Sequence, residues 1–239
     1  HERLAEARAQ AERGIALALE AGVAPPHEVL EAAGIAAWKA GDLSAGLGHL
    51  EGLYRRAVQQ GDTSTQIGTL ANLAGMARTL GDRTTWRRAL EEAFATTQRS
   101  GMTFGLPLLR VRQAQLLLQD GQPAAALAEL RRALALLPPG DRWYRITALL
   151  ASGHAQLAAA RAAADVADSA DSAESAALQA AARAAFDEAL AGAVDAGMRA
   201  EAQQGLVLVA LAAGDAAAAG RHADALLEAM ADPAPGDAT

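Results

Sequence analysis

Apolar residues recur three and four positions apart along most of the chain, the spacing that places them on one face of an α-helix. In the first segment, the residues that share such a face are Leu4, Ala7, Ala11, Ile15 and Ala18. No sustained alternation of β-branched residues between turn dipeptides occurs, so the pattern predicts no strands. The chain is therefore predicted to be all-α.

Glycines interrupt the helical segments every 20 residues, at Gly41, Gly61, Gly81, Gly101 and Gly121. Gly22 and Gly140 lie within one residue of the same spacing. Glycine tolerates the left-handed conformation found just past many helix ends, so each of these positions predicts a helix end. An aspartate that can cap the next helix directly follows four glycines, at Asp42, Asp62, Asp82 and Asp215. Two helices per unit give a repeat of about 40 residues, which indicates a superhelical array of antiparallel helix hairpins.

We predict a single helical-repeat domain over residues 1–231 and a tail or linker at 232–239. Its parts are a partial repeat at 1–22 and repeats at 24–61, 62–101, 102–140, 141–197 and 198–231. Turns within the repeats are expected at Gly41, Gly81, Gly121 and Gly214.

The repeat at 141–197 is too long by about 17 residues, and this surplus falls at 161–177. Acidic residues stand three apart there, at Asp165, Asp168, Asp171 and Glu174. A step of three drifts around a helix and builds no core face. We therefore predict an inserted acidic loop, mobile, with a helical extension at either side as a further option, and with the next closing glycine at Gly197.

The third full repeat resembles a tetratricopeptide repeat. Ala114 lies seven residues before Gly121. The positions five, nine, twelve and seventeen residues after Gly121 are Ala126, Leu130, Ala133 and Pro138, respectively. Small residues at such positions let two helix axes approach to about 8–9 Å. The other repeats match in part. The repeat at 62–101 keeps Ala74, Leu90 and Ala93 but has Trp86 where a small residue is expected. The repeat at 24–61 keeps Gly34, Gly46 and Leu50 but has Leu53, and the repeat at 198–231 keeps Ala219 but has Val207.

The long period and the Gly-Asp turns are most similar to the MalT-like (maltose-regulator) branch of the family. Such repeats form the sensing domain of large bacterial ATP-dependent transcription regulators. The resemblance implies a superhelix that binds an effector, a protein or another domain of its own chain. The nucleotide-binding and DNA-binding parts of those regulators have no counterpart here, since no Gly-x-x-x-x-Gly-Lys-Ser/Thr motif and no basic recognition helix occurs.

In this family the first helix of each hairpin lines the concave face. Transferring that geometry by distance from the turn glycine gives the candidate binding residues Glu28, Glu31, Trp38, Lys39, Asn72, Arg78, Arg112, Gln115, Gln119, Ser152, Glu201 and Gln204. Asn72, Arg78 and Arg112 fall on neighbouring repeats, where together they could hold a carboxylate through charge-assisted hydrogen bonds. The alternative is that they are only solvated groove residues.

The tryptophans and the arginine pairs have structural interpretations. We predict that Trp86 and Trp143 pack in the core, while for Trp38 packing and a role in the groove are both open. The pairs Arg55-Arg56, Arg87-Arg88 and Arg131-Arg132 fall on second helices and are predicted to form a solvated convex face.

Composition narrows the partner classes. The formal net charge of −7 argues against nucleic acid, although the stretch 78–145 holds 11 Arg and only 6 acidic residues. No apolar run reaches 18 residues, so we expect no membrane span. The absence of cysteine excludes disulfides and thiolate metal sites and fits a cytoplasmic location. Because the chain begins with His1 rather than Met, we expect it to be part of a longer protein.

Nothing in the sequence favours an enzyme. The five histidines are scattered without metal-binding spacing, and neither a Gly-x-Ser-x-Gly elbow nor a Gly-x-Gly-x-x-Gly loop occurs. We therefore expect no catalysis and no cofactor. The leading hypothesis is a domain that binds a protein, a peptide or a partner domain of its parent chain, with an acidic segment or a C-terminal carboxylate as the favoured ligand. The alternatives are a small-molecule effector sensor, which Trp38 beside Glu28 and Glu31 would suit, and a homo-oligomeric scaffold.

Overall fold

The computed structural model describes residues 2–138, 140–167 and 173–231, and their regular secondary structure consists of eleven α-helices without a strand. The helices are α1 (Glu2–Glu20), α2 (His27–Lys39), α3 (Leu43–Gln60), α4 (Thr63–Leu80), α5 (Arg83–Ser100), α6 (Leu106–Gln119), α7 (Pro123–Leu136), α8 (Arg142–Ala167), α9 (Ala173–Gly192), α10 (Ala196–Ala212) and α11 (Ala216–Ala231). The all-α prediction is confirmed. None of these described helices is long and apolar enough to cross a membrane.

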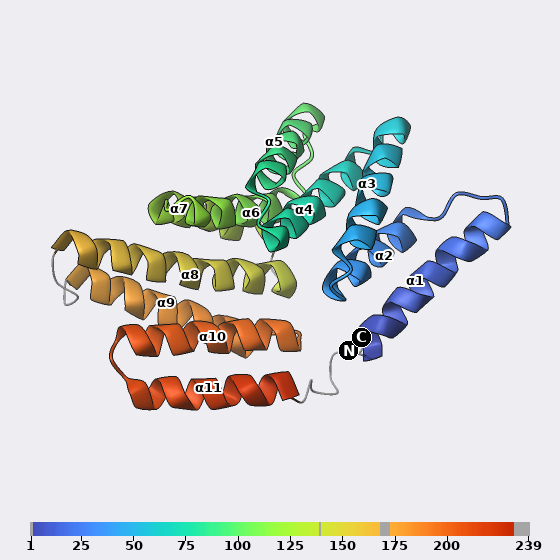
Figure 1. Ribbon diagram of the computed structural model, residues 1–239. Coiled ribbons are helices and arrows are strands. Elements are labelled where there is room, and N and C mark those ends of the chain that lie inside the picture. The colour runs from blue at the N-terminus through green and yellow to red at the C-terminus, as the bar shows by residue number, and fades with distance from the viewer. Residues whose placement is uncertain (1, 139, 168–172, 232–239) are drawn as a thin grey trace. The chain divides into compact units, whose positions relative to one another are not determined.

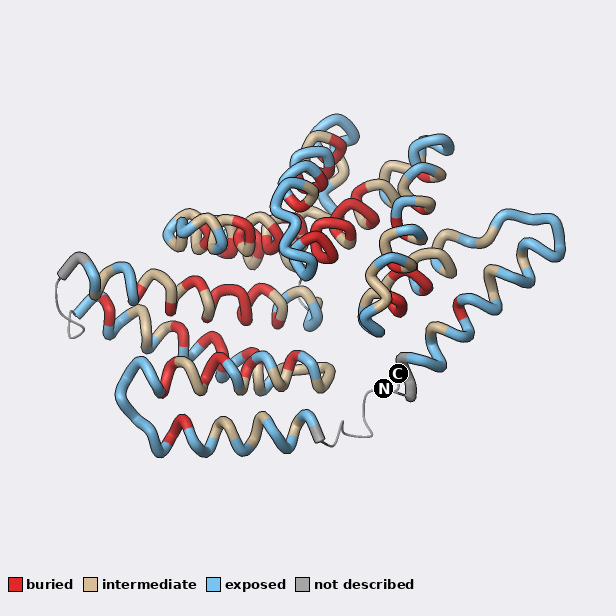
Figure 2. Tube along the Cα trace, viewed as in Figure 1, coloured by how far each residue is buried: buried red, intermediate tan, exposed pale blue. Residues whose placement is uncertain are grey.

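The chain forms two compact units, His1–Arg112 and Gln113–Thr239. In the first unit, α2 pairs with α3 and α4 with α5, while α1 packs on α2 and α3 on α4. In the second, α8 pairs with α9 and α10 with α11, while α7 packs on α8 and α9 on α10 (Figure 1). Buried residues lie where helices of a unit face each other, and exposed residues lie on the opposite sides (Figure 2). Packing of consecutive helices within each unit confirms the array of helical hairpins.

The Gly-Asp turns have the geometry that the sequence predicts. At the end of α3, Gly61 adopts the left-handed conformation with φ of 68°. The Asp62 N–H donates to the Ala57 carbonyl and the Gly61 N–H to the Val58 carbonyl, which is the hydrogen-bond pattern of a Schellman motif. The Asp62 carboxylate then accepts from the Thr65 N–H at 3.0 Å and caps α4. One dipeptide thus ends a helix and begins the next.

Small residues occupy the helix crossings. Ala114, Ala126 and Ala133, which carry the repeat resemblance, are all 0% exposed, so their predicted burial is confirmed. In the first unit, a β-carbon built on Gly34 would lie 2.9 Å from Leu50 Cγ, and one built on Gly46 would lie 3.0 Å from the Gly34 carbonyl oxygen. Neither position has room for a side chain, because α2 and α3 cross there in close contact.

The core of the second unit is built around Phe186 of α9, which is fully buried. Its ring occupies the space that two glycines leave open. A β-carbon on Gly153 of α8 would lie 2.5 Å from the ring, and one on Gly205 of α10 would lie 2.3 Å from it. The two glycines allow one aromatic ring to join three helices.

The structure corrects two sequence predictions about the long repeat. The predicted insertion at 161–177 is helical wherever it is described. Helix α8 continues to Ala167 and α9 begins at Ala173, so helical extensions at either side occupy residues that were assigned to the loop. Residues 168–172, with Asp168 and Asp171, lie outside the described residues. Ser175 is buried, and its hydroxyl donates to the Ala160 carbonyl at 3.0 Å. The added turns therefore pack through small residues and need no apolar stripe.

Gly197 is the second correction. It lies inside the first turn of α10 rather than at a helix end, and α9 already ends at Gly192. Asp195, which the glycine pattern did not single out, caps α10 by accepting a hydrogen bond from the Met198 N–H at 2.7 Å.

Candidate binding surface

Side chains from successive first helices meet in the first unit. The Asn72 amide of α4 donates to the Glu31 carboxylate of α2 at 2.8 Å. Seven residues further along each helix, the Trp38 indole N–H of α2 donates to the Thr79 hydroxyl of α4 at 3.3 Å. Seven residues are about two helical turns, so both contacts lie on the same faces of the two helices.

Arg112 of α6 extends this surface to a third first helix. A β-carbon built on Gly75 would lie 2.8 Å from Trp38 Cη2 and 3.0 Å from Arg112 Nη2. The indole and the guanidinium therefore converge on the bare backbone of α4 at Gly75. We call the set of Glu31, Trp38, Asn72, Thr79 and Arg112 the first-helix row.

The first-helix row is only partly open to solvent. Glu31, Trp38 and Asn72 are half-buried, whereas Arg112 is only 9% exposed. A bound group would therefore first contact Asn72, Glu31 and Trp38. It would reach only the edge of the Arg112 guanidinium. Burial of a guanidinium among fixed neighbours also orients its donors, which favours directional hydrogen bonds with a planar acceptor such as a carboxylate.

Arg78, which the sequence groups with Asn72 and Arg112, is exposed. Six residues correspond to about 240° around an α-helix, so Arg78 projects from α4 about 120° away from Asn72. Thr79, one residue later, lies almost in line with Asn72 and forms the contact with Trp38. No sequence pattern marks Thr79 or Gly75, because their role depends on the side chain that approaches from α2.

The remaining candidates of α2 and α6 occupy varied environments. Glu28 and Lys39 are exposed near the two ends of α2. On α6, Gln115 is half-buried and Gln119 is exposed. All four residues lie on first helices as the sequence predicts.

In the second unit, α8 and α10 are first helices that also contact each other. His154 Nε2 of α8 lies 3.6 Å from the Glu201 carboxylate of α10, and the His154 ring packs edge-on against Phe186 at a centroid distance of 5.0 Å. No sequence pattern marks His154 as a site residue, although it stands two residues after the candidate Ser152. Ser152 itself is buried, and its hydroxyl donates to the Ala148 carbonyl of its own helix. Gln204 is exposed on α10.

The tryptophan predictions have different outcomes. Trp86 is fully buried, as predicted. Trp143 is 43% exposed and packs edge-on against Tyr144, so its assignment to the core was wrong. Trp143 lies in the first turn of α8, at the helix end.

The arginine pairs of the second helices are mostly solvated. Five of the six are exposed, namely Arg55, Arg87, Arg88, Arg131 and Arg132. Arg56 is half-buried and donates to the Pro25 carbonyl. Second helices also contact each other: the Tyr54 hydroxyl of α3 donates to Glu92 of α5, and burial together with this carboxylate raises the pKa of Tyr54 to about 12.

Comparison with known proteins supports the fold alone. No protein-family model matches the chain, and no curated protein matches it. Among solved structures, the chain is similar to BtubC (BKLC) from P. vanneervenii, with a TM-score of 0.57 and 16% sequence identity over 99% of this chain and 96% of that chain. The likeness extends over nearly the full length of both chains and is that of an all-α helical-repeat fold.

Proposed function

We propose that this protein is a non-catalytic recognition domain that binds a protein or peptide segment across the first-helix row. The observation that carries the proposal is the convergence of α2, α4 and α6 at Gly75, where Trp38 and Arg112 approach one stretch of backbone. A surface shared by side chains of three successive first helices suits an extended ligand, because such a ligand can contact one helix after another.

We further propose that the hairpins are tetratricopeptide repeats of the MalT-like type, in a cytoplasmic regulatory protein. The Gly-Asp turns, the period of about 40 residues and the fully buried Ala114, Ala126 and Ala133 support this assignment. A partner domain of the same parent chain is then one source of the bound segment.

A carboxylate is the ligand group that best fits the first-helix row. The Asn72 amide already donates to a carboxylate, that of Glu31, so the geometry for such a bond is present. An incoming carboxylate of an acidic residue or a chain terminus would replace Glu31 as the acceptor, and the Arg112 guanidinium would favour its charge. Glu31 then acts as an internal competitor of the ligand.

The test uses fluorescence anisotropy with labelled acidic peptides that end in a free carboxylate, and with the same peptides amidated at the C-terminus. Loss of a hydrogen bond to a charged group should weaken binding by about tenfold or more, so Asn72→Ala and Arg112→Gln should each do so. Glu31→Ala should tighten binding, because it removes both the competing acceptor and a like charge. Binding should also weaken as salt concentration rises.

Arg131→Ala provides the matched control, because Arg131 is an exposed arginine on the second helix α7. It should leave the affinity unchanged. A thermal melt of Arg112→Gln separates loss of binding from loss of folding, since Arg112 is buried. Equal effects of Arg112→Gln and Arg131→Ala, or weaker binding by Glu31→Ala, would contradict the proposal.

A further inference from the structure

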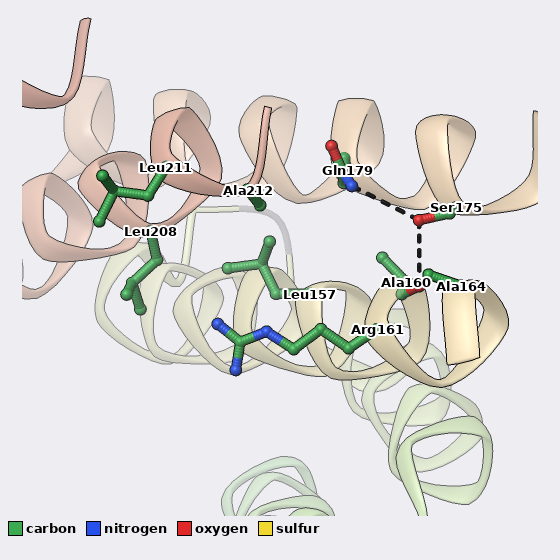
Figure 3. A pocket seen from close by; sticks show the side chains of 9 residues that line it. All are labelled: Leu157, Ala160, Arg161, Ala164, Ser175, Gln179, Leu208, Leu211 and Ala212. Carbon is green, nitrogen blue, oxygen red and sulfur yellow. Dashed lines mark hydrogen bonds between the residues drawn. The ribbon is translucent and has the colours of Figure 1, made fainter. Parts of the chain in front are cut away.

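The second unit contains a pocket that is separate from the first-helix row. It has a volume of about 360 Å³ and lies between the C-terminal part of α8, the N-terminal part of α9 and the C-terminal end of α10. Its apolar wall includes Leu157, Leu208 and Leu211, and polar side chains enter from α8 and α9 (Figure 3). Pockets for small ligands usually have about 300–1,000 Å³ and this mixture of a mainly apolar lining with few polar groups.

The surplus residues of the long repeat build this pocket. They lengthen α8 and α9, whose connected ends extend past the end of α10 (Figure 1). Arg161 and Ala164 of α8 and Ser175 of α9 come from the added turns and line the pocket, and Ala160 lines it from the position directly before them. The surplus residues add little to the core but help to form the pocket. The longer repeat therefore creates a cavity that a repeat of regular length would lack.

The polar wall of the pocket is held in place by internal hydrogen bonds. The Ser175 hydroxyl donates to the Ala160 carbonyl at 3.0 Å, and the Gln179 amide donates to the Ser175 hydroxyl at 3.4 Å (Figure 3). This chain of bonds satisfies the backbone carbonyl and the hydroxyl, and it leaves the Gln179 amide at the pocket wall as a neutral polar group.

Among the residues that the structure describes, Arg161 is the one charged residue that lines the pocket. Its side chain runs from α8 beneath Leu157, toward the side where Leu208 lies (Figure 3). Among the described residues, no hydrogen bond or ion pair of Arg161 is found. The exposed carboxylates of Asp165 and Glu174 lie on the added turns but do not line the pocket.

We propose that this pocket binds a small monocarboxylate with an unbranched apolar chain, of about the size of octanoate. The chain lies against the three leucines, where it is removed from water, and the carboxylate accepts hydrogen bonds from the Arg161 guanidinium. This is a second binding activity, and it does not depend on peptide binding at the first-helix row.

The test is isothermal titration calorimetry of the full chain with three ligands that share one chain length: octanoate, 1-octanol and octylammonium. Octanoate should bind tightest, by about tenfold or more over the other two, because only its head group carries a negative charge that pairs with the Arg161 guanidinium, whereas 1-octanol can accept a hydrogen bond without that charge and octylammonium repels the guanidinium. Arg161→Gln should remove this preference. Ala164→Phe should abolish binding, since it fills the pocket.

Arg183→Gln is the control, because Arg183 is an exposed arginine of α9 that does not line the pocket. It should change none of the affinities, and thermal melts should show that all three variants fold. No binding of octanoate to the wild type, equal binding of octanoate and 1-octanol, tighter binding of octylammonium, or displacement of octanoate by the acidic peptides alone would each overturn the proposal.

Discussion

Replacement of Gly205 by alanine tests the packing of the second unit most sharply. The added β-carbon would lie 2.3 Å from Phe186 Cε1 and 2.5 Å from Cδ1 and Cζ, whereas ordinary contacts begin at 3.4 Å. The ring would have to move by roughly 1 Å, yet Gly153 of α8 also approaches it so closely that a β-carbon there would lie 2.5 Å from Phe186 Cζ. Because Phe186 is fully buried between two helices that both approach closely, α10 must move instead.

Two opposing effects determine how much Gly205→Ala changes the free energy of unfolding. Overpacking of a well-packed core costs about 1–3 kcal/mol, and a ring confined from two sides should place the cost near the upper end. Alanine is a better helix former than glycine, and this difference stabilises the folded state of the variant by about 1 kcal/mol. We therefore expect Gly205→Ala to destabilise the protein by about 2 kcal/mol, which lowers the Tm by roughly 4–8 °C for a chain of this size.

Thermal unfolding followed by circular dichroism measures the effect. Gly220→Ala on α11 is the control, since a β-carbon there meets nothing within 4 Å, and it should raise the Tm. Phe186→Leu should destabilise the wild type but cost less in the Gly205→Ala background, because the smaller side chain relieves the clash. An increase in Tm for Gly205→Ala like that of Gly220→Ala would refute the packing described for Phe186.

Two further predictions concern the turns and the crossings. The Thr65 hydroxyl and N–H hold the pKa of Asp62 below its ordinary value of 3.8, so the stability that this carboxylate contributes is present above that value and is lost as the pH falls through the folded-state pKa. Urea unfolding at about pH 3 and about pH 6 should therefore show a smaller acid loss for Asp62→Asn than for the wild type, and equal losses would contradict this role. Ala126→Leu should destabilise by about 1–3 kcal/mol, because Ala126 is fully buried at a crossing, and an unchanged Tm would show that the repeat alignment is wrong.

The sequence predicts most of the fold because its main signal is local. Glycine at a left-handed helix end and aspartate at the following cap act within a few residues, so Gly61 and Asp62 can be interpreted without knowledge of the tertiary structure. The same reasoning failed at Gly197, where a glycine within a helix has no local mark that separates it from one at a helix end. At 161–167 and 173–177 it left helical extensions only as an option beside a loop, since these turns carry no hydrophobic stripe in the sequence.

The candidate site was predictable only in part. Distance from the turn glycine places Glu31, Trp38 and Asn72 on first helices, and the structure brings them into contact with other residues of those helices. The contact partner Thr79 and the burial of Arg112 depend on how closely neighbouring hairpins approach, which the period of a repeat does not determine.

Hydrogen–deuterium exchange with a bound acidic peptide tests the central proposal, recognition at the first-helix row, most directly. The measurement compares amide protection of the full chain with and without a peptide that ends in a free carboxylate. We predict added protection in α2, α4 and α6, greatest around Asn72 and Gly75, with α3 and α5 unchanged. Protection confined to the second helices α3 and α5 would contradict the account.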